Sequence, residues 1–102
     1  MADWAIRVYN KIMILWDETK RQVNLVKHGI DFVGAEAIFD EFMLIREDDR
    51  VAYGEVRFRA LGVKGGRVVG VVYTERGEDV RIISIRKATT YETERYFEAR
   101  GY

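Results

Sequence analysis

The sequence contains no cysteine and no proline, and it has a single histidine among its 102 residues. Without cysteine the chain forms no disulfide, and thiolate chemistry and cysteine-based metal sites are excluded. One histidine is too few for a histidine-rich metal site. Because no linker-like segment interrupts the chain, we expect one domain over residues 1–102, with a folded unit at 12–100. We assign no role to residues 1–10, which fit a flexible leader.

The chain also lacks a hydrophobic run long enough to cross a membrane. Its longest apolar runs, residues 12–16 and 68–73, are far shorter than the roughly 20 residues of a membrane-spanning helix. No signal-peptide-like run follows the charged residues Asp3 and Arg7, so we expect no membrane association and a cytoplasmic location. The 17 basic and 17 acidic residues cancel, so any binding of nucleic acid must come from local clusters of cations.

The composition supports a hydrophobic core, because 48% of the residues are hydrophobic and 13% are aromatic. Residues 12–16 predict a first strand. Asp17 can cap a helix that covers residues 18–28 and ends at Gly29. Asp31 can cap a second helix. The apolar residues of that second helix recur with helical spacing and predict a buried stripe: Ala35, Ile38, Phe39 and Phe42.

Other side chains of these two helices predict surfaces. Val23 and Val26 form a narrow apolar stripe on the first helix. Polar residues three and four positions apart share another face of that helix, and they are Lys20, Asn24, Lys27 and His28. Carboxylates at the outer positions between residues 36 and 49 predict an acidic surface that RNA would avoid: Glu36, Asp40, Glu41, Glu47, Asp48 and Asp49.

The second half of the chain predicts strands and a final helix. From Val56 to Ala60, apolar residues alternate with Glu55, Arg57 and Arg59, which is typical of a strand with one buried and one charged face. Residues 62–67 predict a hairpin turn, and residues 68–74 and 80–86 predict two further strands. Thr89 and Glu92 have capping-box spacing, so the last helix should begin at Thr89. This order implies an α+β fold, in which an antiparallel sheet of about four strands packs with two N-terminal helices and one C-terminal helix.

The cations near the last strand predict an anion-binding edge. Arg86 and Lys87 lie where this strand meets the start of a helix, although two basic residues at a strand end also fit a solvated rim. Arg81 and Arg86 are separated by an odd number of positions, so a regular strand would place them on opposite faces. Both can meet one ligand only if a bulge or the strand end intervenes.

A second candidate cluster combines Lys27, His28, Glu55 and Arg57. If these side chains converge, they supply a base, cations for a phosphate and an acid, which are the groups needed to cut RNA without a metal. A simpler interpretation pairs His28 with carbonyls at its helix end and Glu55 with Arg57 in an ion pair. Tyr96 offers an aromatic face for a base, but an aromatic residue at helical spacing also fits the core.

Several separated motifs resemble the BrnT toxin family over residues 14–98. They are Trp16-Asp17, Asn24 with Lys27-His28-Gly29, Phe32, Ala35, Gly54-Glu55 with Arg57, Val72 to Gly77, Arg81 to Ser84, Arg86, Ala88, Thr89, Glu92 and Tyr96. The resemblance implies a RelE-like fold and a type II toxin–antitoxin ribonuclease that blocks translation. It also implies a BrnA-like antitoxin that covers the toxin and binds operator DNA, and toxin pairs within the complex. No cofactor and no metal are implied.

Two hypotheses follow from the residues and the resemblance. In the first, the chain is a metal-independent endoribonuclease: Lys27 and Arg57 stabilise the phosphate, and His28 or Glu55 transfers protons. The RNA contacts are then Arg59, Arg81, Arg86 and Tyr96. In the second, the chain is a non-catalytic module that binds an antitoxin-like partner or nucleic acid. The second is supported by the zero net charge and by the absence of the family's usual arginines from three positions: Thr90, Tyr91 and Thr93.

Overall fold

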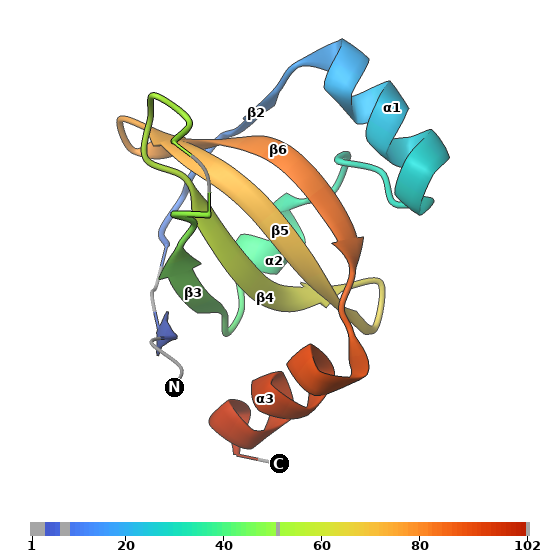
Figure 1. The fold of residues 1–102 in the computed structure, drawn as a ribbon, viewed down its shortest axis with the longest axis vertical. Coiled ribbons are helices and arrows are strands. Elements are labelled where there is room, and N and C mark those ends of the chain that lie inside the picture. Colours follow the sequence, from blue (N-terminus) through green and yellow to red (C-terminus); the bar gives the residue numbers. More distant parts are fainter. Residues whose placement is uncertain (1–3, 7–8, 51, 102) are drawn as a thin grey trace.

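The computed structural model describes residues 4–6, 9–50 and 52–101 of the chain. A twisted sheet forms its centre, and three helices lie around the sheet (Figure 1). The elements follow in the order β1 (Ala5–Ile6), β2 (Ile14–Trp16), α1 (Glu18–His28), α2 (Glu36–Phe39), β3 (Leu44–Glu47), β4 (Phe58–Lys64), β5 (Arg67–Arg76), β6 (Asp79–Lys87) and α3 (Thr90–Arg100).

The α+β class is confirmed, but the sheet differs from the predicted one in size and direction. It has six strands in the order β1-β3-β4-β5-β6-β2. It is mixed, because β2 pairs in parallel with β6 while the other pairs are antiparallel. The prediction of about four antiparallel strands was therefore wrong in detail. It missed β1 and β3, which have two and four residues and so contain too little alternation to identify.

The predicted boundaries of two helices are confirmed. The Asp17 carboxylate accepts a hydrogen bond from the Lys20 backbone N–H at 3.0 Å, and Gly29 ends α1 in the left-handed conformation with φ 71°. Thr89 caps α3 in a complete capping box with Glu92. These contacts satisfy backbone groups that a helix end leaves free, so the local sequence is enough to predict them.

The second predicted helix is mostly absent. Only Glu36–Phe39 is helical, and the residues before it form turns around Gly34, which has φ 87°. The apolar residues nevertheless reach the core, since Ala35 and Ile38 are buried. The irregular segment covers the sheet as a helix would, so the hydrophobic pattern predicted burial correctly and secondary structure incorrectly.

The two faces of the sheet are covered differently. One face packs against α2 and the irregular segment before it, and Phe32, Val71 and Tyr73 lie in the larger hydrophobic cluster there. The other face carries a smaller hydrophobic cluster at the end where Tyr96 of α3 packs on Leu61 and Val68. Figure 1 shows α3 beyond that end of the sheet and α2 behind it. We call the partly covered face the arginine face, after the side chains described below.

Helix α1 attaches to the sheet through a polar residue instead of its apolar stripe. Val23 is 59% exposed and Val26 is 89% exposed, so these residues do not form a buried contact. Asn24 is buried, and its amide nitrogen donates to the carbonyls of Ile30 and Ile85 at 3.0 and 2.8 Å. The Ile85 N–H donates back to the Asn24 amide oxygen at 3.1 Å. Asn24 therefore pairs with the edge of β6 as a neighbouring strand would.

The leader predicted for residues 1–10 falls partly on residues 1–3 and 7–8, which lie outside the described residues. Of the others, Ala5 and Ile6 pair with Ile45 and Leu44 of β3. No helix in the described part of the chain is long and apolar enough to cross a membrane.

Candidate functional site

The register of the sheet places several predicted site residues on the arginine face. Arg46 of β3 pairs with Arg59 of β4, Arg59 pairs with Val72 of β5, and Val72 pairs with Ser84 of β6. Cross-strand partners project to the same side of a sheet, and neighbouring strands are about 5 Å apart. One row of side chains thus extends from Arg46 across the sheet to Ser84.

A bulge brings Arg81 and Arg86 onto this same face. Gly70 pairs with Arg86 and Thr74 pairs with Arg81, and the register shifts by one residue between Val72 and Tyr73. Four positions separate the two partners on β5 but five separate the two arginines on β6, because Ile83 is the extra residue. Both arginines therefore project to one side of the sheet. This is the arrangement in which the two side chains can contact the same ligand.

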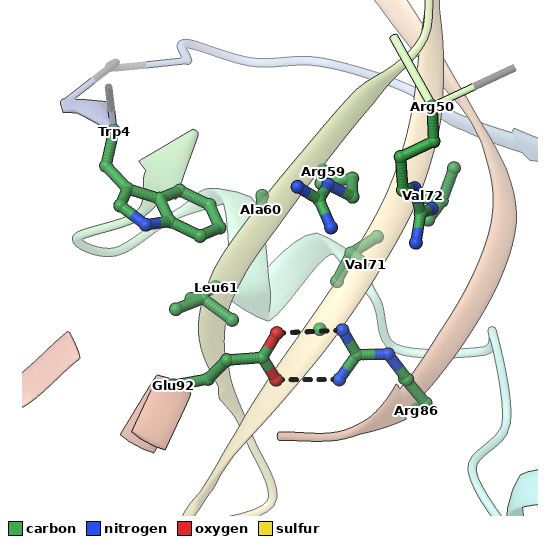
Figure 2. Close-up of a pocket in the computed structure, with 10 residues that line it drawn as sticks. Trp4, Arg50, Arg59, Ala60, Leu61, Val71, Val72, Arg86 and Glu92 are labelled. Atoms are coloured by element: carbon green, nitrogen blue, oxygen red, sulfur yellow. Dashed lines mark hydrogen bonds and ion pairs between the residues drawn. The ribbon is translucent and has the colours of Figure 1, made fainter. Parts of the chain in front are cut away.

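A small cavity lies on this face between the sheet and the start of α3 (Figure 2). Its volume is about 20 Å³. We call it the arginine cavity, because three arginines contribute to its wall. Figure 2 shows the Arg59 side chain between Ala60 and Val72, with Arg50 beyond Val72 and the Arg86–Glu92 pair below them. The complete lining consists of Trp4, Arg50, Arg59, Ala60, Leu61, Gly70, Val71, Val72, Arg86 and Glu92.

Asp48 supplies the negative charge at one end of the cavity. Its side chain is fully buried and accepts hydrogen bonds from Arg50 at 2.6 and 2.8 Å. These bonds lower the pKa of Asp48 to about 2. Its contact with Arg59 is longer, 4.0 Å. Burial lowers the pKa of Arg59, and the neighbouring charges of Arg50 and Arg46 lower it further. The Arg59 guanidinium therefore lies among other positive charges, and the nearby carboxylates compensate its charge only in part.

Glu92 supplies the negative charge at the other end. Arg86 donates to both oxygens of the Glu92 carboxylate at 2.8 and 2.9 Å, a bidentate pair. The hydrogen bonds from Arg86 are the main reason that the pKa of Glu92 falls to about 2. Gly70 makes room for this pair, because a Cβ at that position would lie 3.0 Å from the Arg86 guanidinium.

Lys27 and His28 lie in a separate, open pocket between α1 and β6. Its volume is about 310 Å³. The side chains of Lys27 and His28 make no hydrogen bond or ion pair with the rest of the described chain. We call this the helix-edge pocket, and it is lined by Thr19, Lys20, Val23, Asn24, Lys27, His28, Ile83 and Ser84. Ser84 belongs to both this pocket and the row that contains Arg59.

Glu55 and Arg57 form a third group near the start of β4. The Arg57 Nε donates to Glu55 at 3.0 Å, and Arg76 donates to the same carboxylate at 3.2 Å. The hydrogen bond from Arg57 is the largest cause of the lowered pKa of Glu55. Arg57 also lies 4.2 Å from the ring centroid of Tyr53. No hydrogen bond or ion pair joins Glu55 or Arg57 to His28 in the described structure, and Figure 1 shows α1 and the segment before β4 at opposite sides of the sheet.

The aromatic residue predicted to contact RNA lies in the core. Tyr96 has no exposed surface, and its hydroxyl donates to the Phe42 carbonyl at 3.1 Å. A ring without exposed surface has no face on which a base could stack, so Tyr96 positions α3 in this structure. Tyr91, on the same helix, is 64% exposed.

Sequence reasoning missed Arg50 and Glu92 as lining residues of the cavity, and Asp48 as the partner of Arg50 beside it. Asp48 was assigned to an acidic surface, although the nearby Arg50 could have indicated an ion pair. Glu92 was recognised only as a capping residue, and its second role depends on the bulge that turns Arg86 toward it. Within the described ranges, no group of three or more histidine, aspartate or glutamate side chains is arranged to hold a metal ion.

Comparison with known families gives one match. The model of the family described as "Ribonuclease toxin, BrnT, of type II toxin-antitoxin system" matches residues 16–92, well over half of the chain. The matched range begins in β2 and ends at Glu92, so it includes the helix-edge pocket and most of the arginine cavity. A search of curated proteins found no match.

Proposed function

The chain belongs to the BrnT family of ribonuclease toxins from type II toxin–antitoxin systems, and we propose that it is a metal-independent endoribonuclease that inhibits translation by cleaving RNA on the arginine face. The supporting observation is the row from Arg59 to Ser84, which connects the arginine cavity with the helix-edge pocket. A strand of RNA that crosses the face would meet cations in both places.

In the proposed reaction, the 2′-hydroxyl oxygen attacks the adjacent phosphorus and the bond to the 5′-oxygen breaks. A base takes the proton of the 2′-hydroxyl, and an acid gives a proton to the departing 5′-oxygen. The products are a 2′,3′-cyclic phosphate and a free 5′-hydroxyl. Cations stabilise the negative charge that develops on the phosphate oxygens.

The chain offers two groups for proton transfer. In the helix-edge pocket, the imidazole of His28 can act as a general acid or base, and Lys27 lies beside it to attract the phosphate. At the start of β4, Glu55 is the alternative base and Arg57 the phosphate ligand. The carboxylate of Glu55 is held by two arginines, and its lowered pKa makes it a weaker base. We therefore assign proton transfer to His28 first and to Glu55 second.

Cleavage of a test mRNA by single variants tests this assignment. We expect His28→Ala to slow cleavage about 10² to 10⁴-fold, the usual contribution of a general acid or base, and Glu55→Gln to have a smaller effect. Glu94→Gln, at an exposed position on α3, serves as the control for a single charge change. Undiminished cleavage by both His28→Ala and Glu55→Gln would remove these residues from the mechanism. Addition of EDTA should leave the rate unchanged if the reaction is metal-independent.

A second candidate function is a non-catalytic module that binds an antitoxin-like partner or nucleic acid. It is favoured by one observation: Glu92 already pairs with Arg86, and Thr90, Tyr91 and Thr93 add no cation beside it. Expression of the chain alone separates the candidates. Growth arrest that a neighbouring open reading frame relieves supports the nuclease, and normal growth with retained partner binding supports the module.

The family description implies an antitoxin partner and an RNA substrate. We further propose that the antitoxin is BrnA-like, that it binds operator DNA while the toxin contacts that DNA only through it, and that toxin pairs occur within the complex. The proposed fold relationship is RelE-like, and the proposed location is the cytoplasm, where the RNA substrate is translated.

A further inference from the structure

We infer that the arginine cavity binds a single phosphate group of the RNA, which replaces Glu92 as the partner of Arg86 and is also held by Arg50 and Arg59. The identity of the substrate rests on the proposed function. The binding of phosphate itself is a property of the cavity that can be measured without RNA cleavage.

The size of the cavity selects the kind of group that can enter. A volume of about 20 Å³ is room for about one water-sized group. One phosphate oxygen fits, while a nucleobase does not. The contact would therefore fix the position of the RNA backbone without distinguishing one base from another.

The charges around the cavity favour an anion. Its lining includes three arginines and one carboxylate, with Asp48 hydrogen-bonded to Arg50 beside it. The Nε of Arg59 is buried and has no hydrogen-bond partner. A buried donor without a partner is unfavourable by itself, and a phosphate oxygen is a suitable acceptor for it. The neighbouring positive charges also lower the pKa of Arg59, and a bound anion would reverse that effect.

Glu92 occupies the position of a competing anion. Its carboxylate presents two oxygens to Arg86 at 2.8 and 2.9 Å, the same planar geometry that a guanidinium offers to two phosphate oxygens. Arg86 is long enough to reach over Gly70, where no side chain blocks it. A phosphate that bound Arg86 would release the carboxylate of Glu92. The backbone N–H of Glu92 would still donate to the Thr89 hydroxyl. The Thr89 hydroxyl would therefore still cap α3 after Arg86 had exchanged Glu92 for the phosphate.

Titration of the intact chain with inorganic phosphate tests the inference, with the arginine Nε–H signals followed by NMR. We expect the signals of Arg59 and Arg86 to shift, and Glu92→Gln to tighten phosphate binding about tenfold because the competing charge is removed. The glutamine side chain can still accept from the Thr89 N–H, so the helix start is retained. Glu94→Gln on the same helix is the matched control and should bind phosphate as the unchanged chain does.

A second variant keeps the test independent of Glu92. Arg59→Lys should weaken phosphate binding about tenfold, since lysine keeps the charge but loses the planar donor, while Arg67→Lys at an exposed strand end should not. Equal binding by the unchanged chain and the Arg59→Lys and Glu92→Gln variants would overturn the inference. Equal shifts by acetate and phosphate would also overturn it, and would indicate a carboxylate of a protein partner instead. Loss of RNA cleavage with intact phosphate binding would count against the proposed function alone.

Discussion

The arginine cavity and the helix-edge pocket differ in whether their basic side chains are paired with carboxylates. In the cavity, Arg86 is bound to Glu92 and Arg50 to Asp48. In the pocket, the side chains of Lys27 and His28 make no hydrogen bond or ion pair within the described ranges. Both sites belong to one connected surface through the row that ends at Ser84.

This difference suits the two sites to different tasks, one to attracting an RNA phosphate and the other to positioning it. A lysine without a partner is free to approach a phosphate, but its flexible stem holds the phosphate in no defined place. A paired arginine is already oriented, but a ligand must first displace its carboxylate. We infer that the helix-edge pocket collects the RNA backbone and performs proton transfer, while the cavity fixes the register of the strand.

The largest expected effect comes from removing the internal charge of the cavity. Asp48→Ala should lower the free energy of unfolding by about 3 to 5 kcal/mol, because the loss of one partner leaves Arg59 partly buried and uncompensated. Urea unfolding measures this change. Asp49→Ala, its exposed neighbour, should stay within about 0.5 kcal/mol of the unchanged chain. Similar losses in the two variants would show that Asp48 has no special electrostatic role.

A smaller loss of stability is expected when low pH protonates Glu92 and so removes the other negative charge at the cavity. The folded pKa of Glu92, about 2, lies below its ordinary value of 4.5. The ion pair therefore stabilises the fold fully above pH 4.5, and this contribution is lost as the pH falls toward 2. We expect Glu92 to account for about 2 to 3 kcal/mol of that loss. Urea midpoints between pH 7 and pH 2 should decline less in Glu92→Gln than in the unchanged chain; parallel curves would contradict the assignment.

The geometry of the helix-edge pocket should depend on the hydrogen bonds of Asn24, which hold α1 against β6, and not on ion pairs. Asn24→Ala removes three hydrogen bonds, and we expect a loss of about 2 kcal/mol because the Ile85 backbone groups remain without partners. RNA cleavage should fall since Lys27 and His28 lose their position, while phosphate binding in the cavity should not change. Gln22→Ala, whose side chain bonds only the exposed Glu18, is the control. An equal loss of phosphate binding would mean that the two regions are not separable.

The smallest effect concerns attraction alone. Lys27→Ala should reduce the slope of the logarithm of RNA affinity against the logarithm of salt concentration by about 0.7, the value for one contact to a single-stranded phosphate. Its thermal stability should be unchanged. Binding isotherms at several salt concentrations measure the slope, and Arg67→Ala provides an exposed control. A slope that Lys27→Ala leaves intact would place the RNA elsewhere on the chain.

Local signals predicted much of the fold but only part of the site. Asp17 and Gly29 identified the ends of α1, and Thr89 with Glu92 identified the start of α3, because helix ends need partners within a few residues. The alternation before Ala60 identified a charged face that includes Arg59. The same reasoning failed for Val23 and Val26, since helical spacing predicts an apolar stripe without showing what will cover it.

The sequence by itself determined the α+β class, the helix caps and the cationic residues of the second half of the chain, because these depend on neighbours and on alternation. Only the tertiary structure decided which cations meet. The bulge at Ile83 turns Arg81 and Arg86 to one side, Asn24 ties α1 to β6, and Asp48 is buried beside Arg59. Each depends on strand register or on contacts between distant residues, and sequence spacing specifies neither.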